Sequence, residues 1–320
     1  MATRRGTQAR TIPPAGLQIL RWTARTRCVN TDRMSTTWLG RVRARNERKS
    51  HPVRVITDGR APTSDDLLDI LRDPFDDELW PDELASVWQR LADRDAAVER
   101  PAVATVADVD VLAPCRPGKL LCVGRNYRAH AAEMGNEVPT EPLMFQKPRS
   151  AVVGSGANVV VPPGFNRVDM ESELVAVIGK RGRNIAAEDA LEYIAGYTLG
   201  NDVSNRDLQR GDKLWTRGKG FDTFAPLGPW IRLTEPGVAL PSDARVQGRL
   251  DGELRQDAPL GDMVFDVSAV LAFISACMTL EPGDAIYTGT PEGVSALKPG
   301  QTIEVSLQGF ELGTLTNPTA

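Results

Sequence analysis

Apolar residues in this chain fall mostly into short runs that predict strands. Residues 303–307 alternate apolar and polar side chains, which indicates a half-exposed strand. The uninterrupted apolar run of residues 174–179 predicts a buried strand. Further strands are predicted at residues 38–42, 53–56, 119–124 and 196–202, and an extended segment is predicted at 142–148.

Helical signals are fewer. Ser64 is suited to cap a helix over residues 64–71, whose leucines and isoleucine would form its apolar side and which Pro74 would end. The other predicted helices cover residues 81–91, 128–134 and 267–280. The fold class expected for the chain is α+β, mostly β, and it depends on a resemblance to a known family that is described below.

The chain is expected to divide into three parts. Residues 1–33 are rich in arginine, with Asp32 their only acid, and their lack of a hydrophobic period predicts a disordered basic extension. Translation beginning at Met34, a flexible basic tail and a transit peptide are all open explanations of this extension. Residues 34–117 are expected to form a small N-terminal α/β domain whose last part, 102–117, is a linker. Residues 118–320 are expected to form the second, larger domain.

Composition excludes several classes of protein. The 320 residues carry a net charge of −4, which argues against nucleic acid as the main partner. No run of eighteen apolar residues exists, so we expect no membrane association. The four cysteines are widely spaced and form no CxxC pair, which is typical of free thiols in the cytoplasm: Cys28, Cys115, Cys122 and Cys277. With His51 and His130 the only histidines, a histidine-rich metal site is excluded.

Three carboxylates are the first candidates for chemistry. Glu171 and Glu173 are two residues apart in an extended segment, so their side chains share a face and repel unless a cation lies between them or one is protonated. Asp202 ends the predicted strand 196–202. With no Cys or His nearby, these oxygens suit Mg²⁺, Mn²⁺ or Ca²⁺ better than zinc. An acidic hairpin on the surface explains the same spacing, and both interpretations stay open here.

A histidine and a lysine are the next candidates. His130 and Glu133 are three apart in the predicted helix 128–134, where a carboxylate can orient an imidazole and raise its basicity, as a water-activating base requires. Lys219 lies between two glycines and near aromatic residues, where its ammonium could approach an anionic ligand. A surface His–Glu pair and a solvated lysine are the alternatives.

Five ordered motifs resemble those of the fumarylacetoacetate hydrolase family, and together they cover roughly residues 119–316. They are Val-Gly-Arg-Asn-Tyr-x-x-His-x-x-Glu (123–133), Glu-Ser-Glu-Leu-x-x-Val-Ile-Gly (171–179), Gly-Tyr-x-x-x-Asn-Asp-x-Ser-x-Arg-Asp-x-Gln (196–209), Lys-Gly-Phe-Asp-Thr-Phe-x-Pro-x-Gly-Pro (219–229) and Leu-Glu-Pro-Gly-Asp-x-Ile-x-Thr-Gly-Thr-Pro-x-Gly-Val (280–294). The resemblance implies a mixed β-sheet roll in the second domain, and a homodimer.

The resemblance also implies a metal site and a reaction. It assigns Glu171, Glu173 and Asp202 as ligands of Mg²⁺ or Mn²⁺. Larger family members use a further aspartate in the first motif, where this chain has Arg125 and Asn126. The implied reaction is metal-dependent hydrolysis of a C–C bond in an acylpyruvate, a 2-oxo acid, through a metal-bound enolate. The catalytic residues would be His130, Glu133 and Lys219, and the substrate-binding residues Arg125, Tyr127, Arg206, Gln209 and Thr290.

Other activities are compatible with the same residues. Relatives of this family decarboxylate 2-oxo acids such as oxaloacetate, or isomerise or hydrate unsaturated oxo-diacids such as 2-hydroxyhepta-2,4-diene-1,7-dioate. A catalytically silent protein with a structural ion is a third class. The loops at residues 135–141 and 210–218 are expected to select the acyl group, and the polar segment 210–213 suggests a second carboxylate on the substrate.

Overall fold

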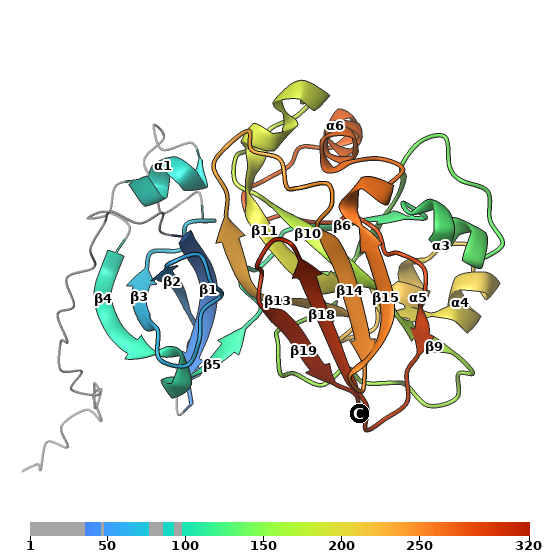
Figure 1. Ribbon diagram of the computed structural model, residues 1–320, viewed down its shortest axis with the longest axis horizontal. Coiled ribbons are helices and arrows are strands. Elements are labelled where there is room, and N and C mark those ends of the chain that lie inside the picture. The colour runs from blue at the N-terminus through green and yellow to red at the C-terminus, as the bar shows by residue number, and fades with distance from the viewer. Residues whose placement is uncertain (1–35, 46–47, 77–85, 93–97) are drawn as a thin grey trace, which may run out of the picture.

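The structure, a computed structural model, describes residues 36–45, 48–76, 86–92 and 98–320 (Figure 1). Strands form most of its regular structure and helices are few and short, which confirms the α+β, mostly β class. The predicted basic extension, residues 1–33, lies outside the described residues.

Among the described residues, the largest sheet holds twelve strands. They are β1 (Thr36–Ala44), β2 (His51–Thr57), β3 (Leu67–Leu71), β4 (Val98–Thr105), β5 (Val109–Leu112), β6 (Leu120–Gly124), β7 (Leu143–Lys147), β8 (Val152–Val153), β10 (Ser172–Ile178), β11 (Ile194–Asn201), β13 (Ala225–Leu233) and β16 (Ala285–Tyr287). The order is β4-β3-β2-β1-β13-β11-β10-β16-β6-β7, with β5 paired to β1 and β8 to β13. The sheet is mixed, because β6 runs parallel to β16 while β10 and β11 are antiparallel.

Two smaller sheets complete the roll. A three-stranded sheet orders β12 (Ser204–Asn205), β9 (Val168–Met170) and β17 (Ser295–Ala296). A four-stranded sheet orders β15 (Glu253–Pro259), β14 (Arg245–Leu250), β18 (Thr302–Gln308) and β19 (Thr314–Pro318). The predicted alternation in β18 is present, since Ile303, Val305 and Leu307 are buried. One buried cluster joins Leu174 of β10 to Val246 of β14 and Val305 of β18, so the main core lies between the large and the four-stranded sheets.

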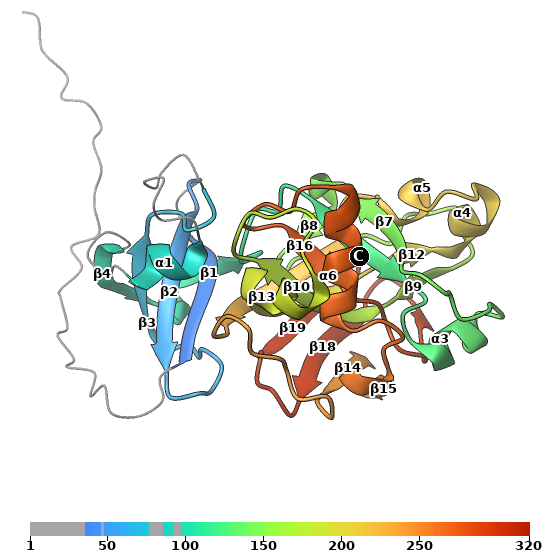
Figure 2. The same ribbon diagram turned by 90° about the horizontal axis from the view of Figure 1, so that it is seen from above.

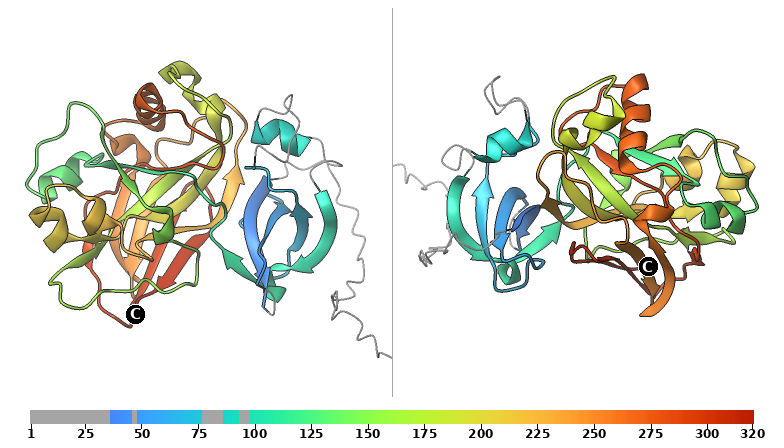
Figure 3. Two further views of the ribbon diagram at one scale, coloured as in Figure 1. Left: turned by 180° about the vertical axis from the view of Figure 1, so that it is seen from behind. Right: turned by 45° about the horizontal axis from the view of Figure 1, so that its top comes forward.

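Short helices surround these sheets. They are α1 (Val87–Ala92), α3 (Arg128–Glu133), α4 (Arg206–Gly211), α5 (Thr216–Lys219) and α6 (Val267–Cys277), with 3₁₀ turns η2 (Val106–Asp108), η3 (Arg149–Ala151), η4 (Ala187–Tyr193) and η5 (Leu260–Asp262). Asp266 caps α6 by accepting a hydrogen bond from the Ala269 N–H at 2.8 Å. In the views of Figures 2 and 3, α3, α4 and α5 lie at the end of the molecule opposite the N-terminal strands. In the part of the chain that the structure describes, no helix is long and apolar enough to cross a membrane.

The predicted helix over residues 64–71 is wrong. Residues 67–71 instead form β3, which pairs with β2 and β4. Irregularities in the β3–β4 pairing bury Leu68 and Leu71, three residues apart, which imitates a helical period. Asp66 accepts from the Thr63 N–H and pairs with Arg60, so the residues before Leu67 form a turn. A run of five residues is too short to be stable as a helix by itself, and pairing on both edges decides the outcome.

The rest of the N-terminal region agrees only in part with the sequence. The predicted strands at 38–42 and 53–56 are present as β1 and β2. Of the predicted helix 81–91, residues 81–85 lie outside the described residues, and the remainder overlaps α1. The segment predicted as a linker, 102–117, contains the end of β4, the turn η2 and the strand β5, which pairs with β1. The domain boundaries themselves stay a prediction.

The N-terminal strands join the large body through one strand pair. Leu39 of β1 pairs with Ile231 of β13, so a single sheet continues from one region into the other (Figure 1). Trp230 lies against β1 at Gly40, where an added Cβ would come within 2.4 Å of the indole ring. Gly40 therefore permits the close approach that makes this contact.

Replacement of Gly40 tests the contact. We expect Gly40→Ala to lower the free energy of unfolding by about 1–3 kcal/mol, because the Trp230 ring must move to admit a methyl group. The measurement is urea denaturation. Gly211→Ala is the matched control, since no atom lies within 4 Å of its added Cβ, and it should change stability by less than about 0.5 kcal/mol. Equal stability of the two variants would contradict the packing described.

Candidate active site

Three carboxylates meet where two central strands end. Glu171 lies between β9 and β10, Glu173 is on β10, and Asp202 directly follows β11. The pairing of β10 with β11, extended by a 2.8 Å hydrogen bond from the Asp202 N–H to the Glu171 carbonyl, brings them together. One oxygen from each lies within 4.8 Å of the others. Their exposures of 4%, 1% and 1% exclude an acidic hairpin on the surface.

Buried cations surround these carboxylates. Lys219 donates to Glu171 Oε2 at 2.9 Å and also to Asp202. Lys147 contacts the other oxygen of Asp202 and the Val203 carbonyl. Arg206 Nη2 donates to Glu171 Oε1 at 2.6 Å. Each cation therefore fixes a particular carboxylate oxygen.

Arg206 is held on three sides. Besides Glu171, its guanidinium donates to Asp169 Oδ2 at 2.8 Å and to Gln209 Oε1 at 2.9 Å. Asp169 is fully buried and lies on β9, two residues before Glu171. Such multiple pairing compensates for the removal of both charges from water. Arg206 thus ties the helix α4 to the carboxylate-bearing segment.

Charges set the protonation of the cluster. Burial by itself would raise the pKa of Glu171, but the charges of Arg206 and Lys219 outweigh it and hold that pKa well below its usual range. Burial, together with the charges of Asp202 and Glu171, raises the pKa of Glu173 well above the ordinary value, and the Gly289 N–H, which donates to Glu173 Oε2 at 2.7 Å, and the charge of Lys219 oppose this only in part. Burial opposes the charge of Lys219, yet Asp202 and Glu171 raise its pKa, so Lys219 is an ammonium at neutral pH.

A divalent cation fits this donor set. All three clustered side chains offer hard oxygen ligands, the kind that Mg²⁺ and Mn²⁺ prefer. When every group is ionised, four carboxylates face four cations, because Arg167 also pairs with Asp169 at 2.8 Å: Asp169, Glu171, Glu173 and Asp202 against Lys147, Arg167, Arg206 and Lys219. The raised pKa of Glu173 marks the carboxylate whose charge is least compensated. A cation at this cluster would share Glu171 and Asp202 with Lys219.

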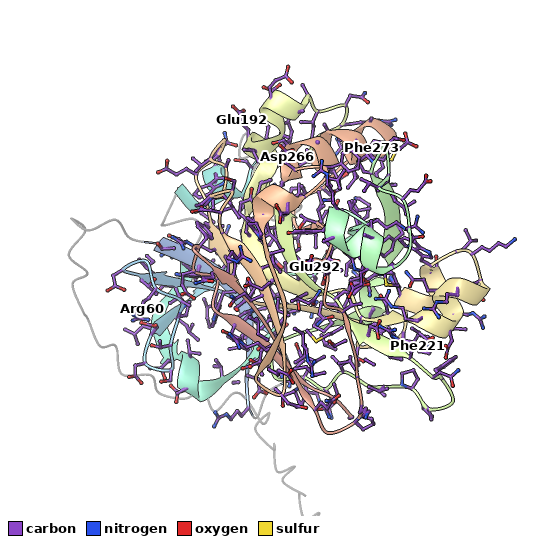
Figure 4. The ribbon with its side chains drawn as sticks, turned by 45° about the vertical axis from the view of Figure 1, so that its right-hand side comes forward. Arg60, Glu192, Phe221, Asp266, Phe273 and Glu292 are labelled. Carbon is purple, nitrogen blue, oxygen red and sulfur yellow. The ribbon has the colours of Figure 1, made fainter. Side chains whose placement is uncertain are left out.

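The predicted His–Glu pair is formed beside the cluster. His130 Nδ1 lies 3.2 Å from Glu133 Oε2 within α3, while His130 Nε2 faces Glu171 Oε1 at 3.9 Å. The other oxygen of Glu133 accepts from the Gly293 N–H at 3.0 Å, and Figure 4 shows Glu292, the preceding residue, next to this helix. His130 is buried. Glu133 is therefore fixed by a second segment and can hold the imidazole ring in one orientation, with Nε2 directed at the carboxylates.

These groups line a cavity of about 240 Å³. Of the residues predicted to bind or act on a substrate, those on its wall are Arg125, His130, Arg206, Gln209, Lys219 and Thr290. Glu133 and Tyr127 are not among them. Glu133 contacts His130, which is on the wall, and the Tyr127 side chain is buried in the main core, where its hydroxyl makes no hydrogen bond with the described residues. Thr290 donates its hydroxyl proton to the Ser172 carbonyl at 2.9 Å. Thr290 has two donors, its hydroxyl and its backbone N–H, and among the contacts of the described residues only the N–H is left for a ligand.

The sequence patterns missed several residues of the site. Lys147 and Asp169 lie in segments predicted to be extended, but nothing in the spacing showed that Lys147 would meet Asp202, 55 residues away. Asp169 had a local signal, since it stands two residues before Glu171 in an extended segment. Trp215 also lines the cavity, and Lys219 Nζ lies 5.6 Å from its ring centroid and 4.7 Å from that of Phe145.

Comparison with known proteins settles the family. The family model described as fumarylacetoacetate (FAA) hydrolase C-terminal matches residues 119–320. The chain belongs to the fumarylacetoacetate hydrolase family. This confirms the family suggested by the five sequence motifs, and with it the fold of the second region.

Named relatives within this family differ in their reactions. A mitochondrial oxaloacetate tautomerase of Bos taurus is 43% identical over 221 residues, covering 66% of this chain and 69% of the relative. The structure of a 2-hydroxyhepta-2,4-diene-1,7-dioate isomerase from Mycobacterium marinum has a TM-score of 0.70 at 33% identity and covers 89% of this chain and 98% of its own. Fumarylpyruvate hydrolase from Pseudomonas aeruginosa, solved with Mn²⁺ and pyruvate, has a TM-score of 0.58 at 37% identity and covers 65% and 91%.

Removal of one clustered carboxylate tests the ion site. We expect Glu173→Gln to weaken the binding of Mn²⁺, because an anionic ligand becomes a neutral one. The loss of affinity should exceed the tenfold or so that removal of an outer-shell partner causes. Isothermal titration of the metal-free protein with Mn²⁺ measures this. Glu304→Gln is the control, because it removes the same charge from a residue of β18 that does not line the cavity. Unchanged affinity in Glu173→Gln would remove Glu173 from the set of ligands.

Proposed function

We propose that this protein is a divalent-metal-dependent enzyme that hydrolyses a C–C bond in an acylpyruvate-type 2,4-dioxo acid. The observation that carries the proposal is the His130–Glu133 pair, with Nε2 of His130 directed at Glu171 inside the same cavity as the three carboxylates. A small cavity with a base, an ammonium and an oxygen-ligand cluster suits a small 2-oxo acid. We expect Mg²⁺ or Mn²⁺ as the cofactor and a homodimer as the assembly.

The proposed ion has one task. Held by Glu171, Glu173 and Asp202, a divalent cation would supply Lewis-acid stabilisation to the negative charge that develops on the 2-oxo-carboxylate head of the substrate. Lys147 and Arg206 keep these carboxylates in position through their ion pairs with Asp202 and Glu171.

His130 would carry the proton through the reaction. With its Nδ1–H donated to Glu133, its Nε2 accepts a proton from water, and the hydroxide attacks the distal carbonyl carbon. The C–C bond between that carbon and its neighbour breaks, its electron pair passes to the pyruvate enolate, and the acyl group leaves as a carboxylic acid. The proton on His130 then returns to the enolate carbon. Lys219, an ammonium in this site, would stabilise the enolate charge without acting as the base.

Substrate orientation would fall to groups on the cavity wall. Arg125 and Gln209 line it, and Arg125 has a left-handed backbone (φ 57°), a conformation that is strained for a non-glycine residue and that functional sites favour. The backbone N–H of Thr290 is a donor for the substrate carboxylate. Arg206 also lines the cavity, but its donors already serve Asp169, Glu171 and Gln209. We therefore expect Arg206 to act mainly by holding these groups.

Keto–enol tautomerisation of oxaloacetate is the second candidate. It is favoured by the 43% identity to the bovine oxaloacetate tautomerase, which exceeds the 37% identity to fumarylpyruvate hydrolase. Tautomerisation needs a single group that removes a proton from the carbon beside the 2-oxo group and returns it to oxygen, and His130 is placed for that as well. Decarboxylation and isomerisation of oxo-diacids use the same stabilised enolate.

A substrate panel separates these reactions. We expect the protein with Mg²⁺ to release pyruvate from acetylpyruvate or fumarylpyruvate, with loss of the diketone absorbance, and EDTA to abolish the release because the developing enolate loses its counter-charge. A change in the enol absorbance of oxaloacetate without release of pyruvate would instead identify a tautomerase. Release of pyruvate from oxaloacetate, but from neither acylpyruvate, would identify a decarboxylase. No reaction with any of these or with unsaturated oxo-diacids, despite bound metal, would favour a catalytically silent protein.

Loss of the proposed base gives the sharpest single test. We expect His130→Ala to lower kcat by a factor of ~10² or more while Mn²⁺ still binds, because only proton transfer is removed. His51→Ala, the other histidine of the chain, is the matched control and should keep normal turnover, since His51 lies on β2 and does not line the cavity. Near-normal turnover in His130→Ala would refute its role.

A further inference from the structure

A second cavity lies where the N-terminal strands meet the large body. Its volume is about 470 Å³, and it shares no lining residue with the active-site cavity. Three arginines line it: Arg41 of β1, Arg116 after β5, and Arg149 of η3. Leu112, Val152 and Val153 form an apolar part of its wall. Figure 1 shows β5 reaching from the N-terminal strands towards this junction.

None of the three guanidinium groups forms an ion pair within the part of the chain that the structure describes, although the charge of Asp73 acts on both Arg41 and Arg116. Among the described residues, no ion pair joins Arg41, Arg116 or Arg149 to a carboxylate, whereas Arg54 pairs with Asp69 at 2.8 Å and Arg206 with two acids. Arg41 and Arg116 instead both donate to the hydroxyl of Ser50. A single neutral oxygen is a weak acceptor for two such donors, and an oxyanion is a stronger one.

The arrangement places the charge of the exposed Arg116 close to the buried guanidinium group of Arg41. Arg41 is only 9% exposed. Burial and the charge of Arg116 lower the pKa of Arg41, and the charge of Asp73 opposes them only in part. Because Arg116 and Arg149 are exposed, the repulsion acts mainly on the buried Arg41, and an anion bound beside it would relieve that repulsion. The site is thus electrostatically prepared for a ligand of negative charge.

The wall of the cavity is fixed by close backbone packing. Gly154, the residue after β8, lies against the start of the segment that carries Arg116, and an added Cβ would come within 2.5 Å of the Ala113 nitrogen. The arginines therefore project from elements whose separation is set by the fold, on the two sides of the junction. A ligand that contacts all three would bridge the N-terminal strands and the large body.

We propose that this cavity binds a small phosphate ester, with its phosphate among Arg41, Arg116 and Arg149 and its organic part against Leu112, Val152 and Val153. Guanidinium groups match the oxygens of phosphate in geometry, and three of them suit a dianion better than a single carboxylate. The cavity is larger than inorganic phosphate requires, and its apolar wall offers a place for an organic group. The proposal does not depend on the reaction at the active site.

Binding of model anions tests the proposal. Isothermal titration with inorganic phosphate, phenyl phosphate and benzoate, in EDTA and at constant ionic strength, should show binding of both phosphates, with phenyl phosphate the tighter. Arg116→Met and Arg149→Met should each lose about tenfold or more in affinity for phenyl phosphate, the usual scale for one charge-assisted hydrogen-bonding group. Because Arg149 is exposed, its variant is expected to fold normally.

Two controls locate the site. Arg181→Met removes the same charge from an exposed residue paired with Glu281 and should bind phenyl phosphate like the parent protein. Glu173→Gln, altered in the active-site cavity, should also bind it unchanged. Absence of binding, or equal loss in Arg181→Met and Arg149→Met, would overturn the proposal. Tighter binding of benzoate than of phenyl phosphate would overturn the choice of phosphate, and a changed affinity in Glu173→Gln alone would move the anion to the active site.

Discussion

The burial of mutually repelling carboxylates is the constraint on which this site depends. Glu171, Glu173 and Asp202 are almost fully removed from water and lie within reach of one another. Such an arrangement is costly unless every charge has a partner. Lys147, Arg206 and Lys219 supply most of that compensation, and each contacts a defined oxygen. The negative charge of Glu173 is the least compensated of the three, and this makes the cluster suited to a divalent cation.

The sheet explains how these charges can be held so closely. β10 and β11 pair in a register that sets Ser172 opposite Asn201, so the two chain ends that carry the acids emerge side by side. The side chain of Asn201 accepts a hydrogen bond from the Glu171 N–H at 2.9 Å, which links the two chain ends directly. Lysines then approach from β7 and α5, and Gly218 allows α5 to lie against α4, since an added Cβ would come within 2.9 Å of the Gln209 nitrogen. A packed, hydrogen-bonded frame thus preorganises the charges.

Under the proposed function, the same frame would serve more than one of the reactions after which the relatives are named. In this proposal the oxygen cluster and the ammonium of Lys219 would stabilise negative charge on a 2-oxo acid whichever bond is changed. The position of His130 relative to the substrate would then decide whether the proton that it accepts comes from water or from carbon. That position depends on Glu133 and on the loop at Gly293, which anchors Glu133. The choice of reaction would therefore depend on the residues in the outer parts of the cavity.

The sequence by itself indicated the central strands and set Glu171 beside Glu173 and His130 beside Glu133, because each of these depends on spacing within one short segment. The mostly-β class and the grouping of Asp202 with the two glutamates came instead from the resemblance of five ordered motifs to a known family. The sequence did not show that residues 67–71 form β3, since pairing with β2 and β4 overrides a local pattern that also fits a helix. Nor did it show Lys147 beside Asp202, or Tyr127 inside the core. Only the tertiary structure decided these, because contacts between residues far apart in the chain depend on how sheets and helices pack, and local periodicity carries no record of that packing.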